Sequence, residues 1–196
     1  MHNPDYDAVT IVVRRDPGLH HPKLRTLVGD AASLSSLRDE IGTDDVFICL
    51  GTTKKKTPDR AEYYRIDHDY VVDAARLAKE RGARSAFLVS SVGSDANSSV
   101  FYLRTKGEAE RDVIALGFKH THIFRPSVIM GEREEHRPGE KALIALWAML
   151  NPLLMGSLSR YRGMDARDIA RAMNRAAEQD AGKVTVYHWR EMRNLL

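Results

Sequence analysis

The chain has 196 residues, 43% of them hydrophobic and 29% charged, which suffices for one α/β domain with a sizeable core. Lys and Arg outnumber Asp and Glu by 30 to 27, too small an excess to indicate a nucleic-acid-binding surface. The single cysteine, Cys49, excludes an internal disulfide, and its apolar surroundings predict a buried thiol in a reducing cytosol. The longest apolar run, residues 142–155, is interrupted by Asn151 and Pro152 and is too short to span a bilayer. We therefore expect a soluble cytoplasmic protein that forms one domain over residues 1–196.

The first quarter of the chain alternates apolar runs with turns. Residues 8–13 are β-branched and predict a buried strand, and residues 24–28 predict a second strand. Residues 33–41 predict a short helix that ends at Gly42 in a left-handed conformation. Residues 46–50 are almost uniformly apolar, which favours a parallel strand covered on both faces.

The rest of the chain continues the alternation. A long helix over residues 59–81 has small alanines on one face, which favours close packing on a sheet. The further predicted strands are 85–89, 120–124 and 184–187, and the further predicted helices are 100–116, 140–150 and 165–178. Strands and helices in this order predict a Rossmann-like, doubly wound parallel sheet, an α/β fold that binds ligands at the carboxyl ends of its strands.

Polar or glycine-containing segments follow four of the predicted strands. Because parallel strands end at one edge of the sheet, we expect these segments to line a single cleft. They are Arg14-Arg15, Gly51-Thr52-Thr53, Ser90-Ser91 and Arg125-Pro126-Ser127.

Tyr102 and Lys106 are four residues apart on a predicted helix, and therefore on one helical face. An ammonium beside a phenol favours the phenolate, and a hydroxyl from the serine pair, Ser90 and Ser91, can hold a carbonyl oxygen. This combination is typical of carbonyl reduction. The alternative interpretation is structural: a core tyrosine whose neighbouring lysine extends to solvent.

Four segments together carry a family resemblance that covers most of the chain. They are CLGTTKKK, RIDHDYVVDAARLAKERGA, FLVSSVGSDANSSVFYLRTKGEAE and FRPSVIMGERE. With them the chain resembles atypical short-chain dehydrogenase/reductases, specifically the Tat-interacting-protein-like oxidoreductases and their bacterial relatives. The resemblance implies a Rossmann sheet, NADP(H) as cofactor and a Ser-Tyr-Lys set for hydride chemistry.

By this resemblance Tyr102 would protonate the carbonyl oxygen, and Lys106 would favour the phenolate and hold the nicotinamide ribose. Ser91, in preference to Ser90, would bind the substrate oxygen. The remaining positions implied to bind cofactor are Arg14 and Arg15 at the adenosine 2′-phosphate, which favours NADP over NAD, Gly51, Thr52 and Thr53 along the cofactor's backbone, and Pro126 on the nicotinamide side.

The departure from the family is a missing glycine-rich turn, because none of the 13 glycines forms G-x-G or G-x-x-G. Family members begin with a strand, this turn and a helix, so we expect an N-terminally truncated fold with unpaired apolar edges at residues 8–13 and 46–50. Three explanations compete. The chain starts at an internal methionine of a longer protein; or the edges close on each other or pair with another chain; or the protein has stopped catalysing.

Two hypotheses about function follow. The first is an NADP-dependent oxidoreductase that binds its cofactor weakly and acts on a small carbonyl or alcohol substrate; the second is a non-catalytic Rossmann-like binding or regulatory protein. We expect neither nucleic acid nor a membrane as a partner. A homodimer that pairs the unpaired strand edges is the expected assembly. No metal site is expected, since His20-His21 lacks a third ligand and residues 132–136 lack HExxH spacing.

Overall fold

The computed structural model describes residues 3–30, 33–34, 36–130, 154–179 and 182–196. The helix expected over residues 140–150 and the acidic segment 132–136 lie outside these ranges. In the described part of the chain, no helix has the length and apolarity needed to cross a membrane.

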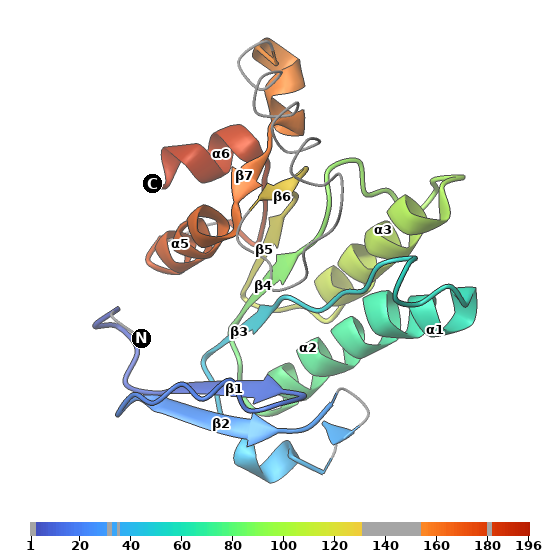
Figure 1. Ribbon diagram of the computed structural model, residues 1–196. Helices are drawn as coiled ribbons and strands as arrows, with labels where there is room; N and C mark the ends of the chain where they lie inside the picture. Colours follow the sequence, from blue (N-terminus) through green and yellow to red (C-terminus); the bar gives the residue numbers. More distant parts are fainter. Residues whose placement is uncertain (1–2, 31–32, 35, 131–153, 180–181) are drawn as a thin grey trace.

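The larger sheet has four parallel strands in the order β3, β4, β5, β8 (Figure 1). Their bounds are β3 (Asp45–Ile48), β4 (Ser85–Val89), β5 (His120–Phe124) and β8 (Val184–Tyr187). Successive side chains of a strand point to opposite faces, and here both faces are covered. One face packs on α2 (Tyr70–Glu80) and α3 (Phe101–Ala115), and the other on α5 (Ala166–Ala177) and α6 (Trp189–Asn194). The predicted doubly wound α/β fold is confirmed.

A separate sheet consists of β1 (Val9–Val13) and β2 (Leu24–Val28), which are parallel. Among the described strands, β1 pairs with β2 alone and β3 pairs with β4 alone, so the two edges do not close on each other. The Tyr6 hydroxyl donates to Asp45 Oδ2 at 2.6 Å and so links the segment before β1 to β3. A third, two-stranded sheet pairs β6 (Ile129–Met130) with β7 (Met164–Asp165).

The helix expected over residues 59–81 is interrupted by a π-helical turn. It comprises α1 (Arg60–Tyr64), the π-helical segment η3 (Arg65–Asp69) and α2. The Asp59 carboxylate caps its start by accepting from Glu62 N at 2.8 Å. Gly82, at φ +103°, follows its end. A π turn inserts one extra residue per turn and so changes the direction of the side chains that follow it.

Two local predictions were wrong. Residues 33–41 contain the short 3₁₀ helix Arg38–Glu40 in place of the expected helix, and Gly42 does not have positive φ. The Ser36 hydroxyl and the Ser36 amide both donate to Ser33 O, at 2.7 and 3.0 Å, so this carbonyl is used by a tight turn and not by an α-helical amide four residues on. Cys49 is exposed and not buried, because it lies just after β3, at the edge where that sheet has no further described strand.

Candidate active site

The loops after β4 and β5 are joined by backbone hydrogen bonds at the carboxyl edge of the sheet. Ser90 N donates to Phe124 O at 2.7 Å, and Val92 N donates to Pro126 O at 2.9 Å. Pro126 is itself buried. Two of the four segments predicted to line a single cleft are therefore held against each other.

The two adjacent serines have different surroundings. The Ser90 hydroxyl lies 3.0 Å from the Ser94 hydroxyl, which itself donates to Ser91 O at 2.7 Å. The Ser91 hydroxyl has one long contact, 3.5 Å to Val92 O. Of the two hydroxyls, that of Ser91 therefore has the weaker contact within the protein and is the more available to donate a hydrogen bond to a ligand.

Tyr102 and Lys106 occupy successive turns at the start of α3 and differ sharply in exposure. The Tyr102 side chain is 39% exposed, whereas Lys106 is 7% exposed. This is the reverse of the structural alternative, a core tyrosine with a lysine extending to solvent, and that alternative was wrong. The accessible phenol and the buried ammonium belong to residues one helical turn apart on α3. An ammonium close to a phenol favours the phenolate, which is the basis of acid–base chemistry at such a residue.

The Lys106 ammonium is paired with Asp67 of η3. Lys106 Nζ lies 2.8 Å from Asp67 Oδ1 and donates to Leu50 O at 3.4 Å. Asp67 Oδ2 accepts from Thr52 N at 2.7 Å. Sequence reasoning missed Asp67, because an acid in the segment RIDHD resembles any charged residue on a helix surface.

Tyr63, on α1, is a second residue that sequence reasoning missed. Its hydroxyl donates to Thr52 O at 3.4 Å, and the Thr52 hydroxyl lies 2.9 Å from that of Thr57. Burial, and then the negative charges of Asp67 and of an ionised Tyr102, raise the pKa of Tyr63. Tyr63 therefore stays a neutral hydrogen-bond donor that helps hold the loop after β3.

Gly107 lets the loop before α3 lie directly on the helix. A Cβ at this position would lie 2.2 Å from the Asp95 carbonyl carbon and 2.3 Å from Ala96 N. Both neighbours are backbone atoms, so they cannot rotate away as a side chain would. Gly107 therefore sets how closely the loop over residues 90–100, the serine loop, approaches the helix that carries Tyr102 and Lys106.

The predicted cofactor residues divide into two groups. Gly51 and Thr52 lie against the buried pair: a Cβ on Gly51 would be 3.3 Å from both Asp67 Oδ1 and Lys106 Nζ. Thr53 is exposed in the same loop. Arg14 and Arg15 are exposed just after β1, in the other sheet. Across the described residues, no hydrogen bond or ion pair joins these arginines to the loop after β3.

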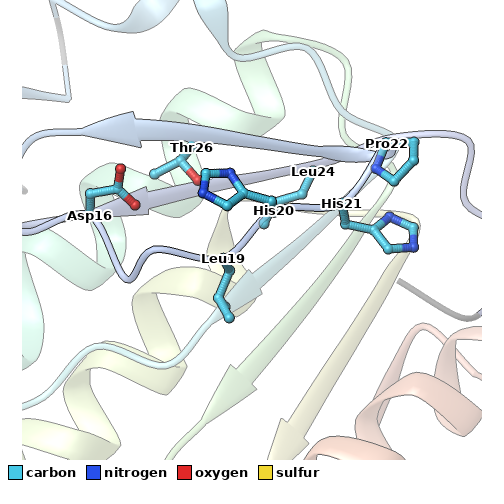
Figure 2. A pocket seen from close by; sticks show the side chains of 7 residues that line it. All are labelled: Asp16, Leu19, His20, His21, Pro22, Leu24 and Thr26. Carbon is cyan, nitrogen blue, oxygen red and sulfur yellow. The ribbon is translucent and has the colours of Figure 1, made fainter.

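Two hollows in the surface lie away from these residues. One, of about 490 Å³, lies beside β2. Figure 2 shows the side chains around it, His20 and Asp16 among them. Another, of about 630 Å³, lies at β6, β7 and α6.

The described ranges contain no cluster of three or more His, Cys, Asp or Glu that could hold a metal ion. In the histidine pair, His21 Nδ1 accepts a hydrogen bond from Lys23 N at 3.1 Å.

Comparison with known proteins identifies relatives by sequence, although no family model matches the chain. It is 39% identical to protein fmp52, mitochondrial, of Aspergillus niger over 177 residues, which cover 87% of this chain and 75% of that protein. With its Aspergillus fumigatus counterpart it shares 37% over 182 residues, covering 88% and 76%. The chain belongs to the FMP52 family.

The match to other FMP52 proteins is shorter. The protein of Eremothecium gossypii is 36% identical over 134 residues, and the chain spans 60% of that relative's length. The cytoplasmic location expected from Cys49 and the apolar runs was wrong, because FMP52 relatives at 35–42% identity are named mitochondrial proteins. Neither cysteine count nor hydropathy separates the cytosol from other reducing compartments.

Solved structures resemble this FMP52 chain in fold. DesIV, a dTDP-glucose 4,6-dehydratase from Streptomyces venezuelae with NAD and TYD bound, has a TM-score of 0.67 at 16% identity, covering 93% of this chain and 66% of that one. RMD from Pseudomonas aeruginosa, complexed with NADPH, has a TM-score of 0.60 at 18% identity, covering 87% and 69%. At this identity the likeness shows the fold alone, which is Rossmann-like.

Proposed function

We propose that this FMP52-family chain is an NADP-dependent oxidoreductase of the short-chain dehydrogenase/reductase type that acts on a small carbonyl or alcohol. The observation that supports it most is the buried Lys106 ammonium one helical turn from the accessible Tyr102 hydroxyl. Burying an ammonium is costly, and the chain meets this cost with the Asp67 ion pair, which keeps the charge on the helix that also carries the Tyr102 phenol.

The proposed chemistry divides among three side chains. In the reducing direction Tyr102 would donate its hydroxyl proton to the substrate oxygen, and the Lys106 ammonium would stabilise the phenolate left behind. Ser91 would donate a hydrogen bond to the same oxygen. A bound nicotinamide would supply the hydride.

The residues fit the two ends of a dinucleotide better than its middle. Lys106 is proposed to hold the nicotinamide ribose and Pro126 to lie on the nicotinamide side, and Thr52 is proposed to lie along the cofactor's backbone. At the other end, Arg14 and Arg15 suit a 2′-phosphate. The pyrophosphate is normally held by the amides of a glycine-rich turn, and the printed sequence contains no G-x-G or G-x-x-G. We therefore propose weak NADP binding by this chain, and derive no step from the pyrophosphate site.

The second hypothesis, a non-catalytic binding or regulatory protein, rests on the same missing turn. Titrating the chain with NADPH and following nicotinamide fluorescence separates the two. Binding at submillimolar concentration supports the oxidoreductase, and absence of binding at that concentration contradicts it.

The arginine pair offers a test of cofactor preference. Arg14→Ala combined with Arg15→Ala should weaken NADPH binding by about tenfold and leave NADH binding within about twofold, because the lost charges face only the 2′-phosphate. Both side chains are exposed, so the melting temperature should be unchanged. Equal weakening of both cofactors would contradict the NADP preference.

Tyr102 is tested by the loss of its hydroxyl alone. Tyr102→Phe should lower NADPH-dependent turnover of a probe carbonyl such as 4-nitrobenzaldehyde by at least about 100-fold, because the proton donor is gone, and leave the NADPH dissociation constant within about twofold. Retained turnover would remove Tyr102 from its proposed role.

A further inference from the structure

The carboxylate of Asp67 is the most deeply buried charge near the proposed site. Its side chain is 1% exposed, and that of its ion-pair partner Lys106 is 8% exposed. Two opposite charges withdrawn from water are stable only when they are held together and satisfied by further polar contacts. The contacts of this pair therefore decide where the ammonium can lie.

Those contacts connect three separate elements. Asp67 belongs to the π-helical segment η3, Lys106 to α3, and Thr52 to the loop after β3. One Asp67 oxygen faces the ammonium at 2.8 Å, and the other accepts from Thr52 N at 2.7 Å. A single carboxylate thus sets the place of the lysine relative to the loop that is proposed to line the cofactor.

The local backbone is shaped for this contact at two points. Asp67 lies within the one π-helical turn described between α1 and α2, and π turns inside α-helices are frequent at functional sites. On the other side, Gly51 has no side chain where a Cβ would come within 3.3 Å of both charged atoms. The loop can therefore lie against the pair.

The two partners described for the ammonium do not use all of its donors. Lys106 Nζ lies 2.8 Å from Asp67 Oδ1 and donates to Leu50 O at 3.4 Å. An ammonium has three N–H donors. Asp67 thus holds the charge in place, and the third donor is the one proposed to reach a ribose hydroxyl.

We propose that Asp67 is a positioning residue for cofactor binding at this site: its carboxylate holds the Lys106 ammonium and the Thr52 amide in one arrangement that the nicotinamide ribose requires. This rests on the proposed function. Asp67 does not touch the substrate in this account, and it acts through Lys106 and Thr52.

The experiment compares NADPH dissociation constants of wild type, Asp67→Asn, Lys106→Met and the double variant. Each single change should weaken binding by about tenfold, and the double variant by about tenfold and not 100-fold, because Asp67 acts through Lys106. The double variant also removes both buried charges, so it should fold even where a single variant is unstable. Losses that multiply, or Asp67→Asn within about twofold of wild type, would overturn the proposal.

Asp112→Asn is the matched control. Asp112 on α3 lies 2.9 Å from His68 Nε2 of η3, so this change perturbs the same two elements away from the loop after β3. We expect NADPH binding within about twofold of wild type. A tenfold loss here would show that any disturbance between η3 and α3 suffices, and would overturn the specific role of Asp67.

A second readout needs no cofactor. Asp67→Asn should raise hydrogen exchange at the Thr52 amide by at least about tenfold, since an amide side chain is a weaker acceptor than a carboxylate, whereas Asp112→Asn should not. An unchanged Thr52 amide in Asp67→Asn would overturn the positioning role while leaving the oxidoreductase proposal standing. Conversely, wild type that binds no NADPH contradicts the proposed function itself, and with it the role of Asp67.

Discussion

The two parallel sheets of this protein differ in how much structure supports them. The four-stranded sheet carries a core on each face, with Phe87, Ile123 and Phe124 at most 1% exposed. In the two-stranded sheet Leu27 is the one buried side chain of β1 and β2, and Val28 is 60% exposed. The proposed proton-transfer residues lie at the edge of the first sheet, and the proposed 2′-phosphate arginines follow β1 of the second.

The two ends of the proposed cofactor site therefore have unequal support. Lys106 is held by a buried ion pair and a packed helix, whereas Arg14 and Arg15 extend from a strand pair with little core of its own. Local stability follows buried apolar contacts, so β1 and β2 should open more readily than β4 and β5. The following predictions test this contrast, from the largest expected effect to the smallest.

Gly107→Ala should destabilise the protein by about 3 kcal/mol or more, because its Cβ would collide with backbone atoms of the serine loop. Urea denaturation followed by circular dichroism measures this free energy. Gly42→Ala is the control, since a Cβ there meets no atom within 4 Å, and it should change stability by less than about 0.5 kcal/mol. A stable Gly107→Ala would mean that the loop does not lie on α3.

Phe124→Ala should cost about 3–5 kcal/mol, because it leaves a cavity in a core where this ring is 0% exposed. Val28→Ala, in the other sheet, should cost less than about 0.5 kcal/mol. Chemical denaturation of both variants compares the two sheets directly. Similar losses would contradict the contrast between them.

The pH dependence of stability should report His122, which stacks on Phe87 with ring centroids 4.4 Å apart. Burial, and then the neighbouring His120, lower the pKa of His122 from 6.5 to about 4. The unfolded chain therefore binds a proton at the His122 imidazole more readily than the folded protein does. The contribution of neutral His122 to the free energy of unfolding is complete above pH 6.5 and is lost as the pH falls towards 4.

The loss attributable to His122 is up to about 3 kcal/mol. His122→Phe keeps a ring in the stack and should flatten the decline in unfolding free energy between pH 7 and pH 5. Denaturation of wild type and variant at several pH values in this range measures the difference. Parallel pH profiles would show that His122 does not carry it.

Tyr6→Phe should have the smallest effect, about 1 kcal/mol, because it removes one hydrogen bond, from the Tyr6 hydroxyl to Asp45. Burial, and then the Asp45 carboxylate, raise the pKa of Tyr6, so this donor persists across the working pH range. Amide hydrogen exchange should rise in β1 and β2 more than in β4. A uniform rise would mean that this bond does not specifically tie the smaller sheet to β3.

Much of the fold could be predicted from the sequence because its strands are short apolar runs bounded by turns. The bounds predicted for β4, β5 and β8 match those in the structure. The predicted helix at residues 33–41 failed where the Ser36 hydroxyl competes for the carbonyl of Ser33. That competition depends on detailed geometry, which apolar periodicity does not contain.

The candidate site divides in the same way. Tyr102 and Lys106 could be proposed from the sequence, because a helix places residues i and i+4 on one face. Ser91 could be proposed because it follows a predicted strand in a segment that carries the family resemblance. Asp67 and Tyr63 could not, because their contacts join segments that are distant in the chain. No local pattern distinguishes an acid that pairs with a buried lysine from one that faces water.

The sequence by itself determined the order of strands and helices and the face shared by Tyr102 and Lys106, since both follow from interactions between residues a few positions apart. Three features emerged only in the folded structure: Lys106 is buried, Asp67 neutralises it, and β1 and β3 do not pair with each other among the described strands. Burial and ion pairing depend on which segments meet once the chain has folded, and that is a property of the packed sheet and helices as a whole.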